Sequence, residues 1–172
     1  MAEAGSERTV GFFDLAETVA PASPDDTGRG HLQARLAAIG ERVRAAGGTV
    51  IKQIGDELMC AFCDPSRAVR CAVELEGAID GWAHDDAVVG LRVGLHHGPV
   101  MEEDGDLFGD TVNIAARMTS IARPGQVITT EEVVRLLADA EQELTRPFDE
   151  VRVKGSSRKR RIYRVLWAPR AE

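Results

Sequence analysis

Apolar positions along the chain alternate between short continuous runs, typical of strands, and stripes at helical spacing. The run Thr9 to Leu15 is β-branched and aromatic, and it predicts a buried strand. Apolar residues at every third or fourth position from Leu32 to Val43 predict a helix that ends at Gly47-Gly48. Between these elements, the segment Ala20 to Gly30 is rich in Pro, Asp and Gly and predicts a loop.

The next region predicts a β-hairpin followed by a helix. Strand-like runs at Thr49 to Ile54 and Glu57 to Phe62 flank Gly55-Asp56, a tight turn of the kind that joins antiparallel strands. An apolar stripe then predicts a helix from Pro65 to Trp82. The turn would place the carboxylate of Asp56 near the end of a neighbouring strand.

The second half of the chain continues this alternation. The expected elements are a strand within Ala87 to Val100 that ends at a Gly98-Pro99 turn, an acidic loop from Glu102 to Asp106, a helix capped by Asp110 that runs through Met118, a strand from Gln126 to Thr129, a helix from Thr130 to about Ala138, and strands Phe148 to Lys154 and Arg161 to Trp167 joined by Gly155-Ser156-Ser157. Neighbouring residues on a strand face opposite sides, so we interpret His96 and His97 as structural residues.

The order of elements predicts an α+β fold. A β-α-β-β-α-β order followed by further α and β elements matches a ferredoxin-like (split βαβ) core, an antiparallel sheet with helices packed on one face and added C-terminal elements. With 172 residues the chain is long enough for one domain with a sizeable core. We therefore expect a single domain over residues 1–172.

Composition and charge restrict which binding partners and which cellular compartment we expect for this protein. The net charge is −7 and no broad basic face is evident, which argues against nucleic acid as a partner. No apolar run reaches the length of a membrane span, and the N-terminus lacks a secretory pattern. An odd count of three cysteines disfavours a disulfide framework and fits a cytoplasmic protein. We interpret Cys60 and Cys63 as small buried apolar residues rather than a metal site.

Charged residues at strand ends indicate candidate chemistry. Asp14 and Asp56 would form a hard-oxygen site for Mg²⁺ if their strands are neighbours. Four basic residues that interrupt strands or a helix face could meet phosphates: Lys52, Arg92, Arg117 and Lys154. No Walker loop is present, so the pattern favours phosphoryl or nucleotidyl transfer on a palm-like sheet. Each residue also has a simpler interpretation, as a solvated strand end, a turn, or an edge-strand charge.

Asn113 and Arg117 lie four positions apart on a predicted helix whose other positions are largely small or apolar. This spacing places an amide and a guanidinium on one helix face, one loop after Asp106. By itself the pattern also fits an amphipathic helix with two solvated residues.

Four blocks in order resemble the class III adenylate and guanylate cyclase catalytic domain. They are Phe12-Phe13-Asp14-Leu15, Lys52-Gln53-Ile54-Gly55-Asp56, Leu91-Arg92-Val93-Gly94-Leu95-His96, and Asp106 to Met118. The spacing of Lys52 to Asp56, followed by that of Asp106, Asn113 and Arg117, is specific. The resemblance covers about Thr9 to Trp167, and it implies one nucleotidyl cyclase domain with a core of about 9–167.

The resemblance implies a two-metal site. Asp14 and Asp56 would hold two Mg²⁺ or Mn²⁺ ions, with the backbone carbonyl of Leu15 as a possible further ligand. Arg117 would neutralise charge that develops on the α-phosphoryl group, and Asn113 would position the ribose. The reaction implied is conversion of ATP to 3′,5′-cyclic AMP and pyrophosphate by in-line attack of the ribose 3′-hydroxyl.

The resemblance also implies how substrate is selected and bound. Lys52 would donate to N1 of adenine and Asp106 would accept from its N6 amino group, which favours ATP over GTP. Arg92 and Lys154 match positions that contact phosphates.

In this family the site lies between two subunits. One subunit would supply the metal ligands with Arg92, and the other would supply Lys52, Asp106, Asn113 and Arg117. Because all are present in one chain, the expected assembly is a symmetric homodimer with two equivalent sites. A regulatory partner or domain is possible, but the sequence does not identify one.

One segment departs from the family pattern. Where the family has Gly-Phe-Thr after the first metal ligand, this chain has Ala16-Glu17-Thr18, which could weaken phosphate binding and make activity low or Mn²⁺-dependent. Two alternatives stay open. One is a guanylate cyclase, and the other is a catalytically weak or inactive cyclase-homology domain for nucleotide binding or dimerisation.

Overall fold

The computed structural model describes residues 6–17, 26–80, 88–153 and 158–167. The strands are β1 (Ser6–Glu17), β2 (Thr49–Ile54), β3 (Glu57–Phe62), β4 (Val88–Glu103), β5 (Asp106–Phe108), β6 (Gln126–Thr130), β7 (Thr145–Arg152) and β8 (Lys159–Val165). The helices are α1 (Asp26–Ala45), α2 (Pro65–Asp80), α3 (Asp110–Ile121), α4 (Glu131–Leu136) and α5 (Asp139–Gln142).

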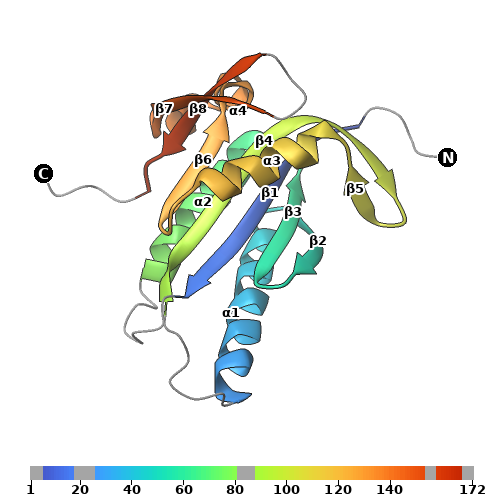
Figure 1. Cartoon of the computed structure of the whole chain (residues 1–172), viewed down its shortest axis with the longest axis vertical. Helices are drawn as coiled ribbons and strands as arrows, with labels where there is room; N and C mark the ends of the chain where they lie inside the picture. Colours follow the sequence, from blue (N-terminus) through green and yellow to red (C-terminus); the bar gives the residue numbers. More distant parts are fainter. Residues whose placement is uncertain (1–5, 18–25, 81–87, 154–157, 168–172) are drawn as a thin grey trace, which may run out of the picture.

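One mostly antiparallel sheet carries the fold (Figure 1). Its strand order is β2-β3-β1-β4-β6-β8-β7, and β5 pairs with β4 outside this path. The first four strands and the helices α1 and α2 form the predicted split βαβ core, in which β1 lies between β3 and β4. The pairing of β4 with β6 is parallel and adds the C-terminal elements to this core. The predicted fold class is confirmed.

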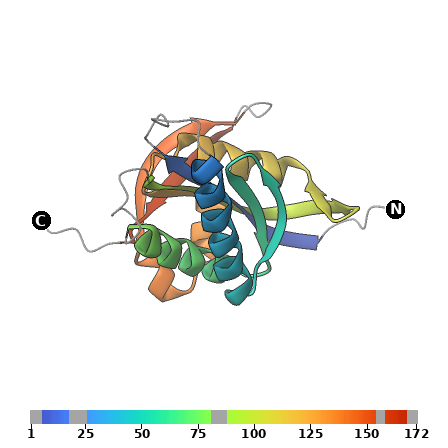
Figure 2. The same cartoon turned by 90° about the horizontal axis from the view of Figure 1, so that it is seen from below.

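The two helices of the split βαβ core pack on one face of the sheet as predicted, and the added helix α3 covers the other face. Phe13 packs with apolar residues of α1 and α2, whereas Phe12 faces the other way and packs in a cluster with Ala115 of α3. Figure 2 shows α1 and α2 on one side of the sheet and α3 on the other. The approach of α3 needs Gly94, because a Cβ there would lie 2.1 Å from the backbone nitrogen of Thr119.

The predicted turn at Gly98-Pro99 is wrong, because β4 continues through both residues to Glu103. Gly98 pairs with Arg8 and Pro99 pairs with Glu7 on β1. Pairing with a neighbouring strand therefore outweighed the local turn preference of the dipeptide. The long strand carries a hairpin away from the body of the molecule, as Figure 1 shows.

The predicted acidic loop is instead the tip of a β-hairpin between β4 and β5. Asp104 and Gly105 form its turn, with φ of 50° and 78°. Positive φ at two central residues is typical of a type I′ turn, for which Asp-Gly is a favoured sequence. The dipeptide Asp104-Gly105 could therefore have predicted this hairpin from the sequence alone. The turn folds Asp106 back opposite Glu103, which fixes its position at the start of β5.

Several helices and strands begin or end at residues other than those predicted. Residues 26–30, placed in a loop, belong to α1, whose later turns outweigh the weak helix propensity of glycine. Gly109 rather than Asp110 is the N-cap of α3, and Asp110 is its first residue and makes no side-chain capping bond. A carboxylate there still faces the positive end of the helix dipole.

The predicted strands from Phe148 and from Arg161 begin earlier, at the first residues of β7 and β8. The helix predicted to continue to about Ala138 ends at Leu136.

Glu76 is a carboxyl group in the core of the domain. Its side chain on α2 is 1% exposed, and its Oε1 atom has no hydrogen-bond partner among the described residues. Burial, with a smaller contribution from Asp80, raises the pKa of Glu76 to about 8. The group is therefore protonated in the folded protein at pH 7 but ionised in the unfolded chain.

We expect Glu76→Gln to stabilise the protein only at higher pH. The folded chain binds the extra proton between the unfolded pKa, near 4.5, and about 8, so stability falls as pH rises through this window. The shift corresponds to an upper limit of about 3 to 5 kcal/mol above pH 8. Urea unfolding at pH 5 and pH 9 would measure the difference between variant and wild type.

The exposed Glu74 on the same helix provides the matched control, and Glu74→Gln should change stability little at either pH. An advantage of Glu76→Gln that stayed constant from pH 5 to pH 9 would contradict the proposed cost of ionising Glu76.

Candidate active site

Charged side chains from three adjacent strands meet on the sheet face that α3 covers in part. Asp14 on β1 is paired in register with Glu57 on β3 and with Arg92 on β4. Side chains of paired residues share one face of a sheet. The Oδ2 atom of Asp14 lies 3.5 Å from Nη1 of Arg92. Arg92 therefore supplies positive charge next to two carboxylates.

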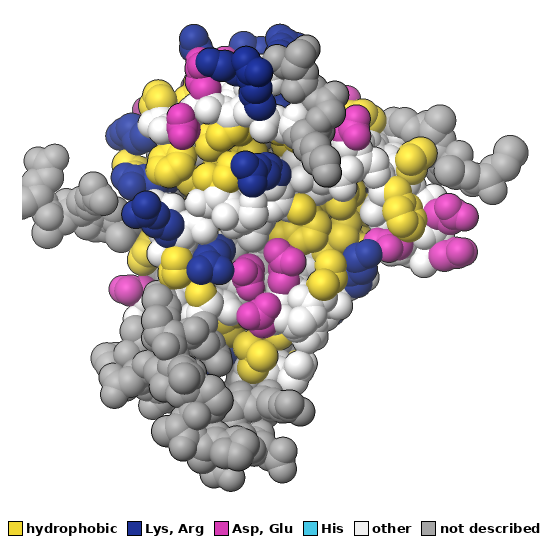
Figure 3. Space-filling view, in the orientation of Figure 1, with side chains coloured by type: hydrophobic (Ala, Val, Ile, Leu, Met, Phe, Trp, Pro, Cys, Tyr) yellow, Lys and Arg dark blue, Asp and Glu magenta, His cyan; other side chains and the backbone are white. Residues whose placement is uncertain are grey.

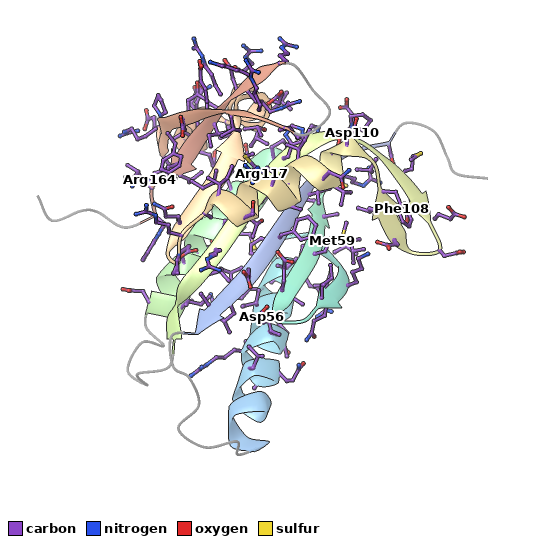
Figure 4. All side chains as sticks on the ribbon, viewed as in Figure 1. Asp56, Met59, Phe108, Asp110, Arg117 and Arg164 are labelled. Atoms are coloured by element: carbon purple, nitrogen blue, oxygen red, sulfur yellow. The ribbon has the colours of Figure 1, made fainter. Side chains whose placement is uncertain are left out.

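Asp56 joins this group from the turn between β2 and β3. Its backbone carbonyl accepts a hydrogen bond from the N–H of Leu15 at 3.2 Å, which fixes the turn against the end of β1. Partial burial raises the pKa of Asp14, and the nearby carboxyl group of Asp56 raises it further, whereas Arg92 lowers it. The predicted neighbours Asp14 and Asp56 are thus brought together. In Figure 3, acidic side chains gather at the position that Figure 4 labels Asp56.

Glu57 is a third carboxylate of this group that the sequence interpretation did not include. Burial, and then Asp14 and Asp56, raise the pKa of Glu57 to about 7. The strand register could have identified it, because a residue directly after the Asp56 turn must pair with the end of β1. The group contains more negative charge than Arg92 alone balances.

This donor set fits a hard divalent cation. Carboxylate oxygens are the ligands that Mg²⁺ and Mn²⁺ prefer. Burial, and then the neighbouring carboxylates, raise the pKa values of Asp14 and Glu57, so a bound cation would stabilise their ionised forms. The described residues contain no cluster of three or more acidic, His or Cys side chains arranged to hold a metal ion by themselves. Asp14 and Asp56 therefore fit a site that water and substrate phosphates complete.

Lys52 and Asp106 form the second part of the candidate site. Nζ of Lys52 donates a hydrogen bond to Oδ2 of Asp106 at 2.8 Å, and the N–H of Leu107 donates to Oδ1 at 2.8 Å. The hydrogen bond from Lys52, followed by that from Leu107, lowers the pKa of Asp106. The two residues lie 54 positions apart, on β2 and β5, so the fold creates this donor and acceptor pair.

Asn113 and Arg117 lie one turn apart on the exposed side of α3. Neither side chain hydrogen-bonds another group in the described part of the chain. The opposite side of the helix is fixed to the sheet, since the Oγ1 atom of Thr111 donates to the carbonyl of Pro99 at 2.7 Å. Figure 4 shows Arg117 on the front of α3, separated from Asp56 by the region around Met59.

The structure thus forms two groups of polar residues, each held together by its own contacts. Asp14, Asp56 and Arg92 are in one group, and Lys52 with Asp106 is in the other. Lys154, a predicted phosphate contact, lies outside the described residues, as do Thr18, the predicted Gly155-Ser156-Ser157 connection and the end of the helix predicted to reach Trp82. The segment after Leu15 begins as regular strand, and the register with β4 shifts between Ala16 and Glu17.

The predictions for histidine and cysteine had mixed outcomes. His96 is buried and its Nδ1 atom lies 2.6 Å from Oγ1 of Thr130, and Nδ1 of His97 lies 2.8 Å from Oγ1 of Thr9. These contacts confirm structural roles on opposite faces of β4. Cys60 is buried as predicted, but Cys63 is exposed because it follows the last residue of β3.

Among the described residues, no helix is long and apolar enough to cross a membrane.

Relatives of known sequence include named cyclases. A pH-sensitive adenylate cyclase of Mycobacterium tuberculosis is 36% identical over 131 residues, which are 76% of this chain and 31% of that protein. An adenylate cyclase of Streptomyces coelicolor is 40% identical over 97 residues, which are 54% of this chain and 25% of that protein. The chain therefore spans about a third of the length of these relatives, or less.

Solved structures share the fold over nearly the whole chain. The catalytic core of a rhodopsin-guanylyl cyclase with converted specificity, in complex with ATPαS, has a TM-score of 0.83 at 26% identity and covers 96% of this chain and 98% of its own. The adenylyl cyclase CyaB from P. aeruginosa has the same fold, with a TM-score of 0.82 at 21% identity over 99% of this chain and 98% of its own. A family model described as the adenylate and guanylate cyclase catalytic domain matches residues 10–166. The chain therefore belongs to the class III adenylate and guanylate cyclase catalytic domain family.

Proposed function

We propose that the chain is an adenylate cyclase that converts ATP to 3′,5′-cyclic AMP and pyrophosphate. The 3′-oxygen of the ribose attacks the α-phosphorus, the bond to the β-phosphate bridging oxygen breaks, and pyrophosphate leaves. The hydrogen-bonded pair of Lys52 and Asp106 carries this proposal, because it presents one donor and one acceptor side by side. Adenine offers an acceptor at N1 and a donor at its N6 amino group, so the polarity of the pair matches adenine.

Asp14 and Asp56 would hold Mg²⁺ or Mn²⁺, two ions per site. Bound divalent ions supply charge that lowers the pKa of the 3′-hydroxyl and neutralises the triphosphate. Support comes from Asp14 and Glu57, whose pKa values are raised by burial and by the neighbouring carboxylates, so a cation beside them would be stabilising. The backbone carbonyl of Leu15 is a further candidate ligand.

The remaining polar residues would bind and orient the substrate. Arg92 is fixed beside Asp14 and is placed to contact phosphates, with Lys154 as a further candidate. Asn113 would orient the ribose, and Arg117 would neutralise charge that develops at the α-phosphoryl group. Since Asn113 and Arg117 have no partners in the described chain, substrate binding would not have to break existing contacts.

A second copy of the chain would complete each site. The metal-binding group of one subunit would face Lys52, Asp106, Asn113 and Arg117 of its partner, so that a symmetric homodimer contains two equivalent sites. Support comes from the exposed position of Asn113 and Arg117 on α3, where a partner could approach them. The shared site predicts that a monomer is inactive.

Purified protein assayed with ATP or GTP, each with Mg²⁺ or Mn²⁺, tests the proposal. We expect cyclic AMP from ATP, at a rate per molecule that rises with protein concentration until the dimer is complete. Asp14→Ala should reduce the rate by ~10³-fold, whereas Glu74→Ala, at an exposed position on α2, should leave it unchanged.

The alternatives predict different products. Cyclic GMP made in preference to cyclic AMP would identify a guanylate cyclase, an activity named for relatives of the same fold. Nucleotide binding without either product in Mg²⁺ and in Mn²⁺ would instead identify an inactive cyclase-homology domain. The Ala16-Glu17-Thr18 segment is the reason to include Mn²⁺, because a carboxylate near the phosphates would weaken the response to Mg²⁺.

A further inference from the structure

A cavity of about 440 Å³ lies between the end of α1 and the first turns of α2. Both helices pack on one face of the sheet, as Figure 2 shows, whereas the candidate active site lies on the face that α3 covers in part. The lining of the cavity includes Ala46, Cys71, Arg42, Arg67, Arg70 and Glu74. None of the residues proposed to bind nucleotide or metal lines it, so the cavity is separate from the proposed cyclase site.

Two of the three arginines in the cavity have no partner. Nε of Arg70 lies 3.2 Å from Oε1 of the buried Glu141, which balances its charge. The side chains of Arg42 and Arg67 are exposed, and neither forms a hydrogen bond or an ion pair with another group in the described parts of the chain. Glu74 forms no ion pair with them there. The cavity therefore contains more positive charge than its own carboxylates balance.

The ends of the two helices do not account for these arginines. At the end of α1, the carbonyl of Arg42 accepts a hydrogen bond from the N–H of Ala46 at 3.0 Å, and that of Val43 accepts from the N–H of Gly48 at 2.9 Å. Backbone groups thus satisfy these last carbonyls without a side-chain cap. Arg67 lies in the first turn of α2, where the helix dipole disfavours a cation and where no acidic residue compensates.

The two unpaired guanidinium groups approach the cavity from opposite helices. Nη1 of Arg67 lies so close to the backbone of Gly47 that a Cβ at this position would be 2.8 Å away. Arg42 acts on the buried thiol of Cys71, because burial and then Glu74 raise the pKa of Cys71 to about 12, whereas Arg42 lowers it. An anion between Arg42 and Arg67 would remove the repulsion of their like charges.

We propose that this cavity binds a phosphate group, held between the guanidinium groups of Arg42 and Arg67. A planar guanidinium donates two parallel hydrogen bonds to the oxygens of a phosphate, which is why arginine is common at such sites. The volume lies within the range typical of small-molecule sites, so the phosphate could be free or carried by a small organic group. Since Glu74 offsets one of the two unpaired charges, a single phosphate fits better than a polyphosphate.

Backbone amide signals of the isotope-labelled chain test the proposal. At constant ionic strength set with chloride, we expect inorganic phosphate to shift the signals of Ala46 and Arg67. The signal of Arg92 reports separately on phosphate bound at the candidate active site. Glycerol 3-phosphate distinguishes the two sources of the group. Tighter binding than that of inorganic phosphate would identify an organic phosphate as the ligand, whereas equal binding would mean that the phosphate alone is recognised.

Matched variants locate the site. Arg42→Gln and Arg67→Gln should each weaken phosphate binding about 10-fold, because each removes one charge-assisted contact. Arg44→Gln is the control, since Arg44 is exposed at the same end of α1 but lies outside the cavity lining. This variant should bind phosphate as the wild type does.

Three results would overturn the proposal. The first is the absence of phosphate-dependent shifts at Ala46 and Arg67 in the wild type. The second is an equal response to added chloride, which would reflect ionic strength alone. The third is a response that persists at Ala46 when both Arg42 and Arg67 are replaced by Gln. The first two need no variant, so they decide the question even if a substitution disturbs folding.

Discussion

Mixing Asp14→Ala with Arg117→Ala should restore cyclase activity that neither variant has alone. Each variant by itself should lose ~10³-fold in activity, because each removes a group proposed to stabilise charge during the reaction. In a heterodimer, one site receives both mutations and the other receives neither. With random exchange of subunits, half of the dimers are heterodimers and each has one intact site, so about a quarter of wild-type activity is expected.

The control for this experiment uses two variants from the same group. Asp14 and Asp56 both belong to the group proposed to bind the metal ions, so a mixture of Asp14→Ala with Asp56→Ala should leave every site defective. This mixture should remain inactive at any ratio. Native mass spectrometry of size-labelled subunits would verify heterodimers in both mixtures. Absence of recovery in a verified heterodimer of Asp14→Ala and Arg117→Ala would exclude a site shared between subunits.

The sequence predicted the elements of the sheet core and the neighbourhood of Asp14 and Asp56, because both depend on local patterns. A continuous apolar run predicts the strand that ends near Asp14, and the Gly-Asp turn predicts where the hairpin before Glu57 reverses. The side of the sheet on which α3 lies had no such local signal. It depends on Gly94, whose missing side chain matters only because Thr119 approaches from a distant part of the sequence.

The family resemblance implied only that Lys52 and Asp106 share a role in binding the purine, and their contact with each other was not predicted. No periodicity connects β2 with β5, and the connection depends on the β4–β5 hairpin, which extends past Pro99 and returns at Asp104-Gly105. Interpreting Gly98-Pro99 as a turn removed that hairpin from the sequence interpretation. Glu57 was missed for a related reason, since its proximity to Asp14 is a property of strand register rather than of either strand alone.

Reversing the polarity of the Lys52 and Asp106 pair should change the preferred base from adenine to guanine. In the double variant Lys52→Glu with Asp106→Lys, the ion pair at 2.8 Å is preserved with its charges exchanged. Position 52 then accepts a hydrogen bond and position 106 donates one. Guanine carries a donor at N1–H and an acceptor at O6, so the reversed pair is complementary to guanine and opposed to adenine.

The expected magnitude follows from the exposure of the pair. A fully buried site that hydrogen-bonds its substrate can reject an analogue by ~10⁴-fold, because its polar groups are left without partners. The side chains of Lys52 and Asp106 are 42% and 28% exposed in the single chain, so water can partly replace a lost contact. We therefore expect kcat/KM for ATP to fall by ~10²-fold and the ratio of ATP to GTP turnover to invert.

The single variants separate base recognition from a general loss of the site. Lys52→Glu alone places two carboxylates together, and Asp106→Lys alone places two ammonium groups together, so each should lose activity with both nucleotides. The double variant should regain activity with GTP only, because it alone restores the pair. Equal losses with ATP and GTP in all three variants, with unchanged thermal unfolding, would show that the pair does not contact the base. Adenine selection would then have to come from other residues.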